Sequence, residues 1–152
     1  MPIVVNSILT IKSPAFKDKG FIPLKYTCDG ANVNPELSID NLPNETKSLA
    51  LIVDDPDAPM GSYVHWIMWN IPPKNKIEED SAPGIEGKNQ KGRNKYSGPC
   101  PPSVIHNYHF RIYALDTELD LPLDSDKQKL ITAMEGHILG TGEIVGLYKG
   151  LE

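Results

Sequence analysis

Residues 47–54 read KSLALIVD, a nearly uninterrupted apolar run that ends in an acidic residue. Two further apolar runs follow, YVHWIMWNI at 63–71 and VIHNYHFRIYAL at 104–115, and both are rich in aromatic and β-branched residues. Runs of this length and composition are typical of β-strands. Because 47–54 is the most apolar of the three, we expect it to lie centrally in a sheet.

Additional strands are predicted at 4–11 and 143–148, with shorter ones near 21–26 and 36–39. One helix is predicted by a capping box, Ser125 with Gln128 three residues later. Leu130, Met134 and Ile138 would form its buried stripe, and Gly140 would end it. Residues 74–96 lack periodicity and predict a long loop.

The composition predicts one all-β domain over residues 1–152, because 14 prolines and 12 glycines favour turns over long helices. A net charge of −5 argues against nucleic acid as a partner. The N-terminus does not resemble a signal peptide and no apolar run could span a bilayer, so we expect a cytoplasmic protein. In that compartment Cys28 and Cys100 are expected to be free thiols, although both fall in loops where they could pair.

Ionisable residues end the apolar rows of three predicted strands. If side chains alternate strictly, Asp55 continues the face of Leu51 and Val53, and Asp57 does so if the chain stays extended through Pro56. By the same rule His65 shares a face with Ile67, Trp69 and Ile71, while His106 and Tyr108 share a face with Phe110, Ile112 and Ala114. Unpaired buried charge is costly, so these groups are expected to meet in one polar cavity.

Such a cavity suits a small anion. Two imidazoles and a phenol supply hydrogen-bond donors, and the aspartates can orient the histidines. The segment KNQKGRNK at 88–95 carries four basic residues and no acidic one, and could draw an anion inward.

The chain resembles the phosphatidylethanolamine-binding protein family, also called Raf-kinase-inhibitor-like proteins, in its bacterial and archaeal branch. The resemblance is carried by DPDAP at 55–59, the strand with His65, GPCPP at 98–102 and HNYHF at 106–110. YTCDG at 26–30 and the segment from Gly142 to Tyr148 also fit.

The resemblance implies two antiparallel β-sheets with Greek-key connections and a few short helices. It also implies a pocket for phosphorylated or zwitterionic headgroups, formed by Asp55, Asp57, His65, His106 and Tyr108, with Pro99 and Pro101 in its wall. Members of the family act as kinase inhibitors in eukaryotes and as protease inhibitors in some lineages. Microbial members often form homodimers.

The sequence therefore favours a non-enzymatic binding protein that needs no cofactor. Three alternatives remain open. Two histidines and two aspartates could ligate zinc in a metal-dependent hydrolase. Ser103 or Cys100 could act with His106 as a nucleophile, although no nucleophile elbow is present. The chain could also inhibit a protease or kinase through exposed loops such as 74–96.

Overall fold

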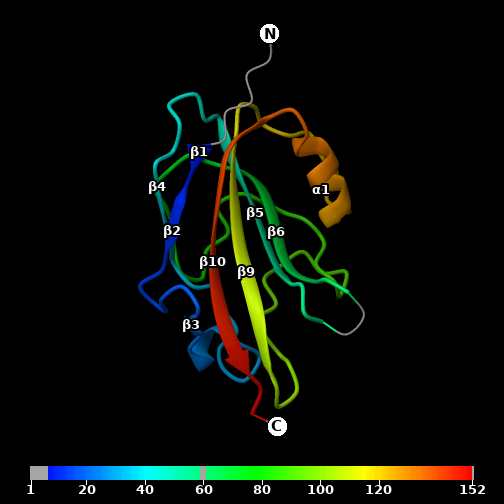
Figure 1. Cartoon of the computed structure of the whole chain (residues 1–152). Coiled ribbons are helices and arrows are strands. Elements are labelled where there is room, and N and C mark those ends of the chain that lie inside the picture. Colours follow the sequence, from blue (N-terminus) through cyan, green and yellow to red (C-terminus); the bar gives the residue numbers. More distant parts are fainter. Residues whose placement is uncertain (1–6, 59–60, 152) are drawn as a thin grey trace.

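The computed structural model describes residues 7–58 and 61–151, which form two β-sheets and one α-helix (Figure 1). The larger sheet contains β1 (Ser7–Ile8), β3 (Gly20–Phe21), β5 (Ser48–Asp55), β6 (Tyr63–Ile71), β8 (Ile85–Glu86), β9 (Ile105–Leu115) and β10 (Ile138–Lys149). The smaller sheet contains β2 (Thr10–Lys12), β4 (Leu37–Asp40) and β7 (Lys76–Ile77). The predicted all-β fold with two sheets is confirmed.

The larger sheet has the strand order β1-β10-β9-β5-β6-β8, with β3 also paired to β10. β5, β6, β9 and β10 pair antiparallel, whereas β1 and β3 run parallel to β10. The chain therefore leaves the β5–β6 hairpin and crosses over to place β9 on the other side of β5. This crossover brings the start of β9 beside the end of β5.

Two layers of apolar side chains cover the two faces of the larger sheet. Between the sheets, Leu51, Val53 and Phe110 pack in the same cluster as Leu37 and Ile39 of β4. On the other face, a second cluster packs under α1 (Lys127–Met134): Ile52, Ile67, Trp69, Leu130 and Met134. All eight residues of β5 are buried, which confirms its predicted central position. Full burial of each large apolar side chain stabilises the fold by about 1.5–3 kcal/mol.

Strand β6 is interrupted by two irregularities in its pairing with β5. Val53 pairs with Trp66 and Asp54 pairs with Val64, so His65 is an extra residue, as in a β-bulge. A second shift falls between Leu49 and Leu51. The prediction of strict alternation is therefore wrong for this strand. Val64, Ile67 and Trp69 face α1, whereas Trp66, Met68 and Ile71 lie in the cluster between the sheets.

The predicted strands agree with the structure in their central parts and differ at some ends. The runs at 47–54, 63–71 and 104–115 correspond to β5, β6 and β9. The last strand begins at Ile138, earlier than the predicted residue 143. The segment 21–26 contains the end of β3 and the 3-10 helix η1 (Leu24–Tyr26). Within the predicted strand 4–11, residues 4–6 lie outside the described residues, and the remainder splits between β1 and β2, in different sheets.

The helix is shorter than its pattern predicts. The Asp126 carboxylate, not Ser125, caps α1 by accepting a hydrogen bond from the Lys129 N–H at 3.1 Å. After Met134 the chain turns at Gly136, whose φ of +80° favours glycine. Ile138 and Gly140 therefore belong to β10 rather than to the helix.

The predicted long loop 74–96 contains the short strands β7 and β8 and is otherwise irregular. It runs from the smaller sheet to the edge of the larger one, so it connects the two sheets. Over the described ranges 7–58 and 61–151, no helix has the length and apolar character needed to cross a membrane.

Candidate functional site

A cavity of ≈ 280 Å³ lies where β5 ends and β6 and β9 begin. Because these strands are antiparallel neighbours, the end of β5 and the starts of the other two fall at the same edge of the sheet. The segment 97–102 forms the opposite wall. The lining residues are Asp55, Ala58, Tyr63, His65, Lys91, Ser97, Gly98, Cys100, Pro101, Pro102, His106 and Tyr108.

Asp55 and His106 form the polar centre of this cavity. The His106 Nδ1 atom lies 2.5 Å from the Asp55 Oδ2 atom, and both side chains are largely buried. The other carboxylate oxygen, Oδ1, accepts a hydrogen bond from the Asp57 backbone N–H at 2.9 Å. Both Asp55 oxygens are therefore engaged, and His106 has only its Nε2 atom available for a ligand.

His65 enters the cavity from the bulge in β6. Its Nδ1 atom lies 2.6 Å from the Ser97 carbonyl oxygen, which can only accept, so the proton of a neutral ring is on Nδ1. Burial lowers the pKa of His65 below its ordinary value of 6.5, although the bond to Ser97 and the charges of Asp55 and Asp54 oppose this. At neutral pH His65 is therefore uncharged, with the Nε2 lone pair free to accept.

Tyr108 lies between the two histidines. Its ring is 5.2 Å from that of His65, edge to face, and 6.4 Å from that of His106. Burial raises the pKa of the Tyr108 hydroxyl, and the charge of Asp55 raises it further, so the hydroxyl stays protonated. Within the described residues, no hydrogen-bond partner is found for this hydroxyl, which leaves it free to donate to a ligand.

The structure brings together most of the residues predicted for the site. Asp55, His65, Pro101, His106 and Tyr108 all line the cavity. Asp57 and Pro99, both described residues, lie outside its lining. The Asp57 carboxylate is exposed and accepts a hydrogen bond from the Asn107 amide at 2.7 Å, and the Pro99 carbonyl accepts one from the Cys28 N–H at 3.1 Å. They support the turns beside the cavity.

Several lining residues were missed by the sequence analysis. Lys91 belongs to the basic segment 88–95, which was expected to draw an anion inward, but it was not singled out as a lining residue. Tyr63 begins a predicted strand and could have been placed at the same edge. Ser97 contacts His65 through a backbone carbonyl, and no residue type signals such a contact.

The chain matches the protein-family model described as "Phosphatidylethanolamine-binding protein" over residues 12–149. It belongs to the phosphatidylethanolamine-binding protein family.

Relatives within the phosphatidylethanolamine-binding protein family extend this match. A UPF0098 protein of Methanothermobacter thermautotrophicus is 48% identical over 149 residues, covering 93% of this chain and 99% of the relative. The crystal structure of a phosphatidylethanolamine-binding protein homologue from Chlamydia trachomatis has a TM-score of 0.90 and 39% identity, covering 93% of this chain and 97% of that one. Escherichia coli YbcL, a family member, has a TM-score of 0.83 and 28% identity, covering 94% and 99%.

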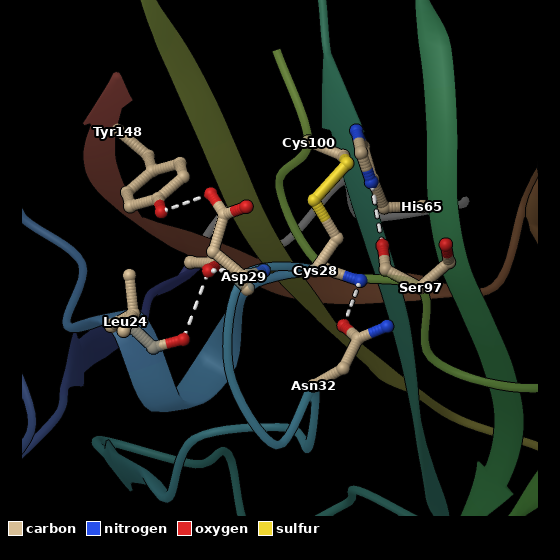
Figure 2. The surroundings of a disulfide bond; sticks show 10 residues. Leu24, Cys28, Asp29, Asn32, His65, Ser97, Cys100 and Tyr148 are labelled. Carbon is tan, nitrogen blue, oxygen red and sulfur yellow. Dashed lines mark hydrogen bonds between the residues drawn. A yellow bond between two sulfur atoms is a disulfide. The ribbon is translucent and has the colours of Figure 1, made fainter. Parts of the chain in front are cut away.

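In this family member Cys28 and Cys100 form a disulfide, with their Cα atoms 5.4 Å apart (Figure 2). The expectation of free thiols is therefore wrong. It rested on the reducing cytoplasm alone, whereas the fold brings together two loops that are 72 residues apart in sequence. Disulfides also occur in oxidising compartments and inside hyperthermophiles, so the bond itself does not identify a compartment.

The disulfide and the cavity geometry bear on the enzymatic alternatives. Cys100 has no thiolate to act as a nucleophile while it is paired, and Ser103 is exposed outside the cavity lining. Among residues 7–58 and 61–151, no group of three or more His, Cys, Asp and Glu side chains is arranged to hold a metal ion. Asp57 lies outside the cavity lining and its carboxylate accepts from Asn107, so the predicted set of two histidines and two aspartates is not found as a ligand set among the described residues.

Proposed function

We propose that this protein is a non-enzymatic binding protein whose cavity takes a small phosphorylated or other anionic group. The family description names a phospholipid-binding protein, which supports a binding role. The names of the relatives specify no ligand for this chain. The ligand class is therefore argued from the cavity.

The observation that carries the proposal is that the cavity presents free donors and a lysine ammonium beside a single carboxylate that is already hydrogen-bonded. Asp55 is the one carboxylate among the described lining residues, and both its oxygens are already bonded. Among the described residues, the lining donors without a hydrogen-bond partner include the Tyr108 hydroxyl and the ammonium of Lys91. A site that offers donors and positive charge favours an anion over a metal ion or an amine.

The size of the cavity limits its ligand. A volume of ≈ 280 Å³ is near the lower end for small-molecule pockets and suits a phosphate with a short substituent. His65, with a free acceptor at Nε2, can bind a hydroxyl or ammonium hydrogen on that substituent. A phosphorylated amino alcohol combines both features.

The test is calorimetric titration of metal-free protein with phosphate and with phosphorylethanolamine. We expect both to bind, and binding to disappear in the His65→Ala, His106→Ala double variant. The matched control is His109→Ala with His137→Ala, which removes two imidazoles that contact Glu143 and Asp116 outside the cavity. Absence of binding in the unaltered protein, together with stoichiometric zinc by elemental analysis, would favour a metallohydrolase instead.

We also propose that binding in the cavity is coupled to a regulatory role toward a protease or kinase, which rests on the family resemblance. Among the basic residues of 88–95, Arg93 and Lys95 are exposed and do not line this cavity, so they are the surface to test. Their replacement should reduce inhibition of a partner while phosphate binding persists. Homodimerisation and a cytoplasmic location stay predictions.

A further inference from the structure

The Cys28–Cys100 disulfide lies at the surface and in the wall of the cavity. Cys100 is a lining residue between Gly98 and Pro101, and both cysteines are exposed to solvent. Cys28 belongs to the loop that follows η1. Figure 2 shows the bond crossing from this loop to the segment of Ser97 and Cys100. A soluble reductant can therefore reach the sulfur atoms without unfolding the protein.

Backbone hydrogen bonds hold the two ends of this wall: the Ser97 N–H donates to the His65 carbonyl at 3.1 Å, and the Pro102 carbonyl accepts from the Gly150 N–H at 3.2 Å. The segment 97–104 forms no strand, and Pro99, Pro101 and Pro102 have no N–H to donate. Its contacts with the loop after η1 are two hydrogen bonds, from the Cys28 N–H to the Pro99 carbonyl at 3.1 Å and from the Gly98 N–H to the Asn32 side-chain oxygen at 2.8 Å. The disulfide adds the covalent link between the two loops.

The position of the wall is coupled to the chemistry of the cavity. The Ser97 carbonyl holds the Nδ1 atom of His65, so movement of the adjoining residues 98–101 would disturb the orientation of this imidazole. The other loop is anchored independently, because the Tyr148 hydroxyl of β10 donates to the Asp29 carboxylate at 2.6 Å. Breaking the disulfide would therefore act on residues 98–101, the part of the wall between its anchored ends.

We propose that the Cys28–Cys100 disulfide is a reversible redox modification site and that its reduction loosens the middle of the cavity wall, residues 98–101. A dithiol reductant acts on it in two exchanges. A reductant thiolate attacks one sulfur atom, the S–S bond breaks, and a mixed disulfide forms while the other cysteine leaves as a thiolate and is protonated. The second reductant thiol then displaces the first cysteine. Two cysteine thiols and one oxidised dithiol result. Disulfides that are exposed to solvent are reduced more readily than buried structural ones, and regulatory disulfides belong to the exposed group.

The consequence for binding rests on the proposed function, because a loosened wall would weaken phosphate binding at the same cavity. The loosening itself is measured without a ligand. We would treat the native protein with dithiothreitol, block the thiols, and compare amide hydrogen exchange with that of the oxidised protein.

We expect complete reduction without loss of the fold. The amides of Cys28 and Gly98, which donate to the Pro99 carbonyl and the Asn32 side chain, should then exchange at least about tenfold faster, with the amides of β5 and β9 unchanged. The Cys28→Ser, Cys100→Ser double variant should reproduce this pattern and show no response to dithiothreitol. If that variant does not fold, hydrogen exchange of the reduced and blocked native protein tests the proposal by itself.

Three outcomes would overturn the proposal: resistance to dithiothreitol below the unfolding transition, unfolding on reduction, or unchanged exchange in the wall. Phosphorylethanolamine titrations of both forms separate the two proposals. Tighter binding of phosphorylethanolamine by the oxidised form supports both the redox site and the proposed function. Faster exchange in the wall, with no binding by either form, supports the redox site and rejects the proposed function.

Discussion

The carboxylate of Asp55, the last residue of β5, lies 2.5 Å from the imidazole of His106, the second residue of β9. The two strands are neighbours in the sheet although some fifty positions separate the residues in sequence. The pair fixes the orientation of the His106 ring and leaves its Nε2 atom toward the cavity. Loss of the Asp55 charge should therefore act on the ligand through His106.

Asp55→Asn is expected to weaken phosphate binding by about 2 kcal/mol, roughly thirtyfold in Kd, because His106 loses a charged hydrogen-bond partner. Calorimetric titration measures this change. The control is Asp57→Asn, two residues away and outside the cavity lining, which should leave Kd within about twofold. Equal losses in the two variants would contradict the central role of the Asp55–His106 pair.

Tyr108→Phe should cost about 1 kcal/mol of binding free energy, roughly fivefold in Kd, since one neutral hydrogen bond to the ligand is lost. The ring is retained, so the thermal unfolding temperature should change little. Tyr113→Phe is the matched control, because Tyr113 lies on the same strand but packs on the face toward α1. An unchanged Kd for Tyr108→Phe would remove this hydroxyl from the binding site.

The pKa of His65 gives the fold a pH dependence of predictable sign. In the unfolded chain His65 titrates near 6.5, and burial lowers its pKa in the folded protein. As the pH falls below 6.5, the unfolded chain takes up the proton first. Stability from the neutral imidazole is thus complete above pH 6.5 and is lost as the pH falls toward the folded-state pKa.

Urea denaturation at several pH values between 8 and 5 tests this dependence. The free energy of unfolding should decrease on the acidic side, and His65→Gln should flatten the decrease. His137→Gln provides the control, because the His137 side chain is 45% exposed. A curve for His65→Gln that parallels the unaltered protein would assign the acid sensitivity to other groups.

Gly98→Ala should displace the cavity wall. A Cβ atom there would press on the Tyr26 carbonyl and lie 2.6 Å from the Asn32 side-chain oxygen and 3.0 Å from the Thr27 Cα atom. Overpacking of this kind costs about 1–3 kcal/mol of stability, and phosphate affinity should fall with it. Ser103→Ala, in the same segment but exposed, should change neither quantity. Denaturation measures the stability of both variants and calorimetry measures their phosphate affinity. Equal values for the two variants would contradict the prediction.

The central parts of the strands could be predicted because no other placement buries their apolar runs equally well. The sequence KSLALIVD can be covered on both faces only near the centre of a sheet, and β5 lies there. His106 and Tyr108 were placed correctly because β9 alternates regularly from His106 to Ala114, with Tyr108, Phe110, Ile112 and Ala114 in one cluster. Regular pairing is what makes a side-chain pattern informative.

The remaining features depend on contacts that residue types do not reveal. His65 lines the cavity, but the alternation from which it was expected there is broken by the bulge. Ser125 and Asp126 are both good caps, and only the backbone decides between them. The Cys28–Cys100 bond depends on the meeting of two distant loops, which composition and compartment cannot foresee.

Because His65 is the extra residue of the bulge in β6, its imidazole is independent of the pairing between β6 and β5. Tyr63, Val64, Trp66, Ile67 and Met68 pair in continuous register with β5 once His65 is left out. Removing this single residue would leave every neighbour facing as it does now, with the ladder intact and the cavity without its second imidazole. The scaffold and the recognition chemistry can therefore be gained or lost independently, so that a relative could keep the architecture while changing what it binds.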